Sequence, residues 1–218
     1  MPKLPFNLCQ PGATSCGACC GLYNFKGHER AALAERLQSR TTTFSRLQKT
    51  RAAWEAEARE IRRREREAGG SPLTQAEPLC PLLGFLDDAQ RRIGCLGHPL
   101  VTRGPDLRDC GNFNAEACEE FLCASFEALT VNEAELVRQC CGDWYLYGLV
   151  ITDPEFVRAC LALVSARSSG RVDAARLRTS ARAAEALGRL FALKHELPPR
   201  TSAPPVLGRS PDTSGLGH

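Results

Sequence analysis

The stretch CGACC, residues 16–20, places three cysteines within five residues, and Cys9 lies a short distance upstream. Two cysteines separated by two residues, as Cys16 and Cys19 are, reach one metal because the intervening turn directs both sulfur atoms inward. Zinc sites and iron-sulfur clusters both use such spacings and need about four thiolates, so other ligands must come from distant parts of the chain. The stretch therefore predicts that the N-terminal half folds around a cysteine-bound metal centre.

The number of cysteines and the expected cellular compartment also favour metal binding. The chain has 218 residues, 43% of them hydrophobic, which is enough for a sizeable core, and its twelve cysteines make up roughly 5.5% of it, well above ordinary usage. The first ten residues, MPKLPFNLCQ, lack the apolar stretch of a secretory signal, so we expect a cytoplasmic protein. In a reducing compartment, clustered thiols bind metal or carry out redox chemistry more often than they form disulfides.

No run approaches the roughly 18 apolar residues of a membrane span, so we expect no membrane contact.

Residues 28–67 have the pattern of one long charged helix. Thr41-Thr42-Thr43 is a poor helix-forming run, so a break there would give two helices. The apolar residues of this segment would form a stripe along one side of the helix, and Arg40 and Arg51 interrupt it. This interruption argues against a self-paired coiled coil and favours a protruding helical arm or hairpin. Gly69, Gly70 and Pro72 are expected to end the segment. Its apolar residues follow heptad-like spacings: Leu33, Leu37, Phe44, Leu47, Trp54, Ala58 and Ile61.

The segment 71–113 is irregular. LLGFL and RIGCL, on either side of DDAQR, predict a small β-hairpin over residues 82–96. The segment has too little apolar periodicity to bury itself, so an external crosslink must offset its ordering entropy. Metal coordination is the obvious candidate for this crosslink.

The rest of the chain predicts conventional helices. Asn114 can cap a short helix carrying Cys118 and Cys123, and Thr130 and Glu133 have capping-box spacing at the start of a helix that continues to about residue 149. Further helices are expected from Pro154 to Ser168-Ser169-Gly170 and, with a basic surface, from about 171 to Pro198.

These elements define the expected fold class: mainly α, with an irregular metal-stabilised cysteine-cluster region, a small β-hairpin, a long charged helix and C-terminal helices. We expect a cysteine-cluster domain over 1–130 that includes the helical arm, and a helical part over 131–197 packed on it. Residues 198–218 are too rich in Pro, Gly and Ser to fold alone and are expected to be a disordered tail.

Three motifs together resemble a known family. CGACC near the N-terminus, CPLLGFLDDAQRRIGCLGHP at 80–99 and LRDC at 107–110 resemble the YkgJ-type cysteine-cluster family, described as a zinc- or iron-chelating domain. The family pattern CxxCxxCC has its first cysteine where this chain has Ala13, and Cys9 is offered instead. The resemblance covers residues 9 to about 123 and implies metal binding but no single reaction. It implies as ligands Cys16, Cys19, Cys20, Cys80, Cys95 and Cys110, with Cys118 and Cys123 as additions.

Other candidates have simpler interpretations. Cys140, Cys141 and Cys160 lie on amphipathic helices, where a buried free cysteine acts as a small hydrophobic residue. His98 is a zinc ligand or part of an ordinary turn between Gly97 and Pro99, and His28 is expected at the surface or as a cap.

The two basic segments give little support to nucleic-acid binding. In REIRRRERE, residues 59–67, glutamates alternate with arginines as on a solvated helix with i,i+4 pairs. The basic helix at 171–194 carries no aromatic platform on which bases could stack, so nucleic-acid binding is not expected.

Three functional hypotheses follow. The first is a protein whose clustered cysteines coordinate zinc or iron, the latter including an iron-sulfur cluster. The second is a redox or modifying enzyme that uses such a cluster, since no motif for metal-independent catalysis is present. The third is an interaction module that binds a protein partner through helix 28–67. The sequence leaves open the metal, the number of sites, any catalytic residue, the substrate or partner and the oligomeric state.

Overall fold

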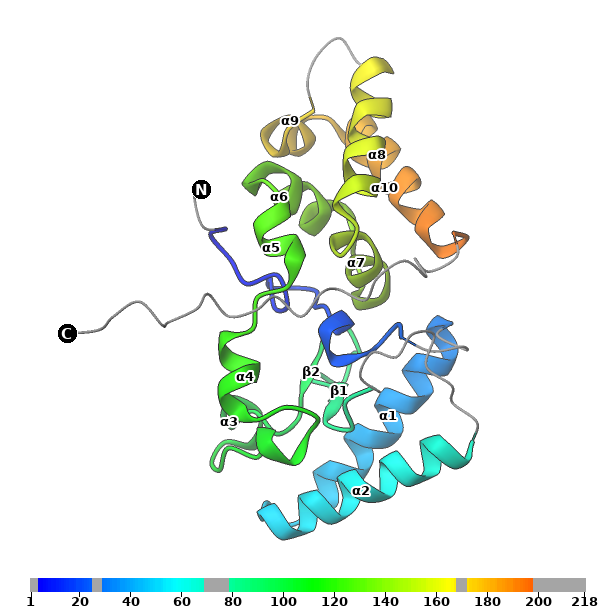
Figure 1. Ribbon diagram of the computed structural model, residues 1–218. Helices are drawn as coiled ribbons and strands as arrows, with labels where there is room; N and C mark the ends of the chain where they lie inside the picture. Colours follow the sequence, from blue (N-terminus) through cyan, green and yellow to red (C-terminus); the bar gives the residue numbers. More distant parts are fainter. Residues whose placement is uncertain (1–3, 25–28, 69–78, 168–171, 198–218) are drawn as a thin grey trace, which may run out of the picture.

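A computed structural model describes residues 4–24, 29–68, 79–167 and 172–197 (Figure 1). The predictions for His28, for the helix ends at 69–72 and 168–170, and for the tail at 198–218 lie outside these residues. The fold is mainly helical with one small antiparallel sheet, as the sequence predicts. Its elements in chain order are η1 Ala18–Cys20, α1 Arg30–Arg46, α2 Arg51–Glu67, β1 Leu83–Phe85, β2 Ile93–Cys95, α3 Pro99–Thr102, η2 Arg108–Cys110, α4 Ala115–Glu120, α5 Ala124–Ala128, α6 Val131–Cys140, α7 Trp144–Ile151, α8 Pro154–Arg167, α9 Ala174–Thr179, α10 Ala181–Ala192 and η3 Leu193–His195.

The molecule has a helical end and a mixed end. In Figure 1, helices α6 to α10 gather at the top, while α1 and α2 lie at the bottom beside the hairpin. The N-terminal segment, drawn in blue, runs between the two ends, so the CGACC stretch lies near the middle of the molecule.

Between residues 29 and 67 the chain forms two helices separated at residues 47–50, so the two-helix alternative is confirmed and the expectation of one long helix is wrong. The threonine run does not break the first helix. The Thr41 hydroxyl donates to the Leu37 carbonyl (2.9 Å) and accepts from the Phe85 amide (2.7 Å), which satisfies it within a helical conformation. The break falls instead before Thr50, whose side chain caps α2 by accepting from the Ala53 amide (3.4 Å).

Helices α1 and α2 are not a free arm. Leu33 and Leu37 of α1 are buried against β1 in one apolar cluster that includes Phe85. Phe44 and Trp54 join the two helices with ring centroids 4.6 Å apart. The apolar stripe is therefore used inside the molecule, which leaves the charged side of the helices for solvent.

The predicted hairpin is confirmed, with Leu83 opposite Cys95. Its outer edges are covered by other segments. The Phe85 amide of β1 donates to Thr41 of α1, whereas the Ile93 amide of β2 donates to the Ser15 hydroxyl (2.6 Å). The N-terminal segment thus lies along β2, which brings it close to Cys95.

The helix predicted from Thr130 to about residue 149 is two helices. The capping box of Thr130 and Glu133 is confirmed at the start of α6. The Asp143 side chain then accepts from the amides of Tyr145 (2.9 Å) and Leu146 (3.1 Å), so it begins a new helix, α7.

Two further helix boundaries differ from the predictions. The basic region after 171 forms α9 and α10, since the Ser180 hydroxyl accepts from the Ala183 amide and starts a helix there. Asn114 caps α4 as predicted, but Cys123 lies beyond that helix, immediately before α5.

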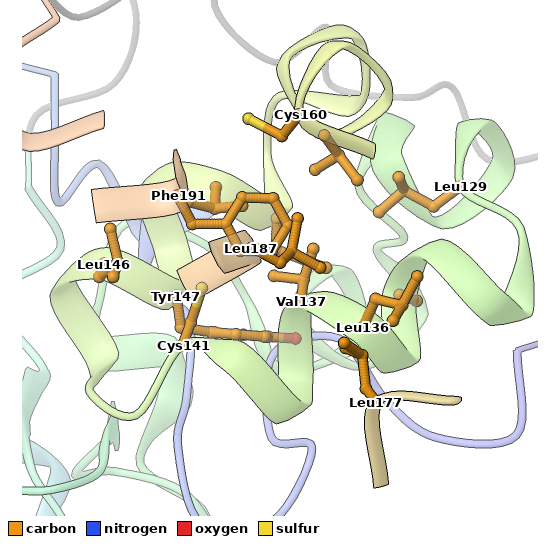
Figure 2. Packing of buried hydrophobic residues seen from close by; sticks show 14 of the residues in the cluster. Leu129, Leu136, Val137, Cys141, Leu146, Tyr147, Cys160, Leu177, Leu187 and Phe191 are labelled. Atoms are coloured by element: carbon orange, nitrogen blue, oxygen red, sulfur yellow. The ribbon is translucent and has the colours of Figure 1, made fainter. Parts of the chain in front are cut away.

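The largest apolar cluster joins the C-terminal helices (Figure 2). Leu4 and Leu8 of the N-terminal segment are buried in it as well. Cys141 and Cys160 lie among its leucines and aromatic rings, and Cys140 packs against it. Their predicted role as small hydrophobic residues is therefore confirmed.

The arginine-rich part of α2 is paired within the helix. Arg63 contacts Glu60 (2.7 Å) and Glu67 (2.6 Å), and Arg64 contacts Glu60 (2.8 Å). This pattern confirms the interpretation as a solvated helical face. Separately, no helix among the described residues has both the length and the apolar character needed to cross a membrane.

Candidate metal centre

All twelve cysteines lie in the described parts of the chain, and none forms a disulfide. Eight of the nine predicted ligands divide into two neighbouring groups. The first thiol group consists of Cys9, Cys16, Cys19 and Cys123, and the second thiol group consists of Cys20, Cys80, Cys95 and Cys118. The two groups adjoin each other, because after burial the charges of Cys80 and then of Cys9 raise the pKa of Cys20.

The first thiol group joins the N-terminal segment to the start of α5. The Cys16 amide donates to the Cys9 carbonyl (3.0 Å), which closes the loop between these two cysteines. Cys16 and Cys123 both pack against the C-terminal apolar cluster, and the thiols of Cys19 and Cys123 share a hydrogen bond. The four thiols therefore occupy one region although more than 100 residues separate Cys9 from Cys123.

Burial and neighbouring thiolates shift the pKa values in this group. Burial, followed by the charge of Cys123, raises the pKa of Cys9 to about 11. The shared hydrogen bond raises the pKa of Cys19 and lowers the pKa of Cys123 to about 6, so Cys123 loses its proton first. Such mutual repulsion among thiolates is relieved when a cation binds between them.

A tyrosine of the helical end supports the first thiol group. Tyr147, which is buried on α7, donates its hydroxyl hydrogen to the Leu8 carbonyl (2.9 Å). The neighbouring Cys9 amide donates to the Asn7 side chain (2.7 Å). These bonds hold the chain on both sides of the peptide that leads into Cys9.

The second thiol group joins the CGACC stretch to the hairpin and to α4. The Cys80 amide donates to the Cys20 carbonyl (2.8 Å). Cys20 and Cys95 pack against the apolar cluster that contains Cys80, and Cys118 comes from α4. Burial, followed by the charge of Cys80, raises the pKa of Cys95 to about 12, and the charge of Cys118 adds to this.

Two buried arginines accompany the second thiol group. Arg40 donates to the Cys80 carbonyl (2.8 Å) and pairs with Glu65. Arg108, which is paired with Asp106 (2.6 Å), acts in the opposite direction to burial because its charge lowers the pKa of Cys95 and of Cys118. The local positive charge favours thiolates, the form that binds metal.

A recurrent backbone contact supports the negative charge on sulfur. The Ala18 amide donates to the Cys16 sulfur (3.4 Å), and the Gly97 amide does the same for Cys95. Cys123 accepts from the amides of Phe126 and Ser125. In each case a donor lies two residues after the cysteine, and each contact lowers the pKa of the thiol.

Cys110 and His98 belong to neither thiol group, although Cys110 is buried in the same apolar cluster as Cys80. The Cys110 sulfur is 3.8 Å from the Arg51 carbonyl, and the charges that influence its pKa come from α2 and from Asp109. His98 caps α3, where its Nδ1 atom accepts from the Leu100 amide (3.2 Å), as expected for a turn residue.

The thiol groups are neighbourhoods and not finished coordination spheres. No three or more His, Cys, Asp or Glu side chains of the described residues are arranged as a metal-holding group. The fit is one of number and chemistry: each group offers four free thiols, the donor type and number used by zinc and by iron-sulfur clusters. Coordination requires side-chain rotations that direct the four sulfur atoms to one point.

Comparison with protein-family models gives no match for this chain, and neither curated proteins nor solved structures give one.

Three supporting residues are absent from the sequence predictions: Arg108, Tyr147 and Tyr23, whose hydroxyl donates to the carbonyls of Trp144 (3.2 Å) and Tyr145 (3.1 Å). A fourth, Arg40, appears there only as an interruption of the apolar stripe. Its position on the buried face of α1 is the signal that it has a partner inside the protein. The other three carry no comparable signal, because their partners are main-chain carbonyls or acidic side chains that only the fold identifies.

Proposed function

We propose that this chain is a metal-binding protein that coordinates zinc or an iron-sulfur cluster through its clustered cysteines. The observation that carries the proposal is the gathering of eight free thiols from three separate segments, residues 9–20, 80–95 and 118–123. Free thiols of this density are unusual unless they bind metal or carry out redox chemistry. The backbone amides that donate to three of the sulfur atoms further favour thiolates.

The metal has a folding role in this proposal. The hairpin has only three residues in each strand, and isolated two-stranded hairpins are marginally stable. A structural zinc ion contributes on the order of 10 kcal/mol or more to a small domain, which suffices to order such a segment. The resemblance of the motifs to the YkgJ-type family agrees with metal binding and leaves the metal open.

Anaerobic purification of the full chain, with elemental analysis and a visible spectrum, tests the proposal. Colourless protein with stoichiometric zinc supports a structural zinc protein, whereas brown protein with iron and sulfide supports an iron-sulfur protein with redox chemistry. Cys140→Ser is the matched control and should keep the full metal content, because the Cys140 sulfur faces the Ala184 carbonyl of α10 (3.9 Å) and the charge of no thiol of either group acts on it. Reduced, metal-free protein that is fully folded contradicts the proposal.

A further inference from the structure

We infer that the eight thiols form two separate four-thiolate centres, and that the boundary between them runs through the peptide bond joining Cys19 to Cys20. The inference rests on the proposed function and adds to it a stoichiometry, a ligand assignment and the exclusion of Cys110.

The two centres lie against different parts of the core. Cys16 and Cys123 pack on the cluster of C-terminal helices, whereas Cys20, Cys80 and Cys95 belong to the cluster formed by α1, α2 and the hairpin. A single centre would have to draw ligands from both clusters. Two centres leave each thiol beside the core in which it is already packed.

The adjacent residues Cys19 and Cys20 have partners in different thiol groups, which allows this division. Cys19 shares a hydrogen bond with Cys123, while the main chain of Cys20 is bonded to Cys80. The 3₁₀ helix η1 ends at Cys20, and its turn closes when the Gly21 amide donates to Ala18 (2.9 Å), with Gly21 in the left-handed conformation (φ 85°). This turn separates the two side chains, so that neighbouring residues serve different centres.

The number of thiols agrees with two centres. Four thiolates complete one tetrahedral zinc site or one iron-sulfur cluster, and eight complete two. Cys110 lies in the resembled motif and is buried in the same apolar cluster as Cys80, yet its sulfur faces the Arg51 carbonyl and the charge of no other thiol acts on it. It therefore stays outside both centres and offers a matched control.

Native mass spectrometry of the anaerobically purified full chain counts the centres. We expect two per chain in the unmodified protein, one in Cys16→Ser, one in Cys95→Ser and none when both substitutions are combined. The control Cys110→Ser keeps two. The inference is overturned if the unmodified protein carries one centre or if Cys110→Ser loses one. Unmodified protein without any metal overturns the proposed function itself.

A second measurement needs no substitution, so it avoids variants that fail to fold. The metal-loaded chain is treated briefly with a chelator and then with N-ethylmaleimide, and the alkylated cysteines are mapped by peptide mass spectrometry. In a molecule that has lost one centre, we expect the four cysteines of one thiol group to be alkylated together. The four cysteines of the other group should stay unmodified. If all eight cysteines become reactive together, the two-centre division is wrong.

Discussion

Arg40 shows how one side chain connects the helices to the candidate metal centre. Its side chain is only 3% exposed, a costly position for a charge unless the charge is paired and hydrogen-bonded. It meets this condition by donating to the Cys80 carbonyl and pairing with Glu65 of α2. The residue that interrupts the apolar stripe is thus a link between α1, α2 and a thiol-bearing segment.

Replacing Arg40 tests this link. Arg40→Met leaves the Cys80 carbonyl and the Glu65 carboxylate without their donor, so we expect the free energy of unfolding to fall by about 2–4 kcal/mol. Chemical denaturation of the metal-loaded protein measures the change. Arg46→Met, at an exposed position on the same helix, should change it by less than about 0.5 kcal/mol. Equal stability of the two variants would refute the link.

Gly148 is a second residue on which a contact between the two ends depends. The Tyr23 hydroxyl lies against Gly148 and donates to the carbonyls of Trp144 (3.2 Å) and Tyr145 (3.1 Å). A Cβ atom at residue 148 would lie 2.9 Å from a ring carbon of Tyr23 and closer still to its hydroxyl. The segment after CGACC therefore needs glycine at this position of α7.

We expect Gly148→Ala to lower the free energy of unfolding by about 1–3 kcal/mol, because the tyrosine must move away from its two carbonyls. Gly188→Ala in α10 is the control, since the nearest atom to its Cβ is the Cys140 carbonyl oxygen at 3.8 Å. It should stabilise the helix by about 0.5–1 kcal/mol. Thermal unfolding monitored by circular dichroism compares the two, and a stabilising Gly148→Ala would show that this contact is absent.

Among the secondary-structure elements, α1 covers the edge of β1 that has no neighbouring strand. The Phe85 amide points away from β2 and is satisfied by the Thr41 hydroxyl. On the opposite edge, the Ser15 hydroxyl and the Gln10 side chain bond to the main chain of Ile93. Both edges of the two-stranded sheet are therefore covered, which adds to its stability.

Thr41→Val keeps the shape of the side chain but removes the acceptor of the Phe85 amide. We expect a loss of about 1–3 kcal/mol in the free energy of unfolding, the cost of a buried, unsatisfied donor. The neighbouring Thr42→Val removes only an exposed contact with Gln38 and should cost less than about 0.5 kcal/mol. Hydrogen exchange at Phe85 provides a local measure, and unchanged protection there would contradict this role of Thr41.

The elements also show what the sequence can predict. The hairpin and the cap at Thr130 were predictable because their signals are local, namely a turn between apolar runs and a capping box. The position of the break between α1 and α2 was not, because Thr41 remains helical through a bond to a residue 44 positions away. Asp143 was a missed local signal, since an N-cap inside an apolar pattern divides one predicted helix into two.

For the whole molecule, the resemblance of the cysteine motifs to a known family implied a set of candidate ligands but not how these thiols divide. Eight of nine candidates fall into the two thiol groups, whereas Cys110, in an equally suggestive motif, faces α2. Its orientation follows from the 3₁₀ turn η2 and from tertiary packing, neither of which the spacing encodes. The assignment of Cys19 and Cys20 to different groups likewise depends on the fold.

The two ends should respond differently to loss of metal. The largest apolar cluster lies in α6 to α10, whereas the hairpin packs in smaller clusters that include the cysteines of the second thiol group. We expect chelation under reducing conditions to abolish hydrogen-exchange protection in residues 79–123 while α6, α7 and α10 keep most of theirs. Chelation that leaves protection unchanged throughout, or that unfolds both ends together, would contradict this division.

The bond from Tyr147 to the Leu8 carbonyl has a consequence for the order in which the protein matures during translation. All ligands of the second thiol group, and the helices and hairpin that support them, emerge from the ribosome before α5. The first thiol group is incomplete until Cys123 has been synthesised, and its N-terminal segment is anchored only after α7 has been synthesised. The growing chain should therefore acquire its hairpin-side centre first. A stalled nascent chain exposed to residue 121 should carry that centre alone, and a chain exposed beyond α7 should carry both.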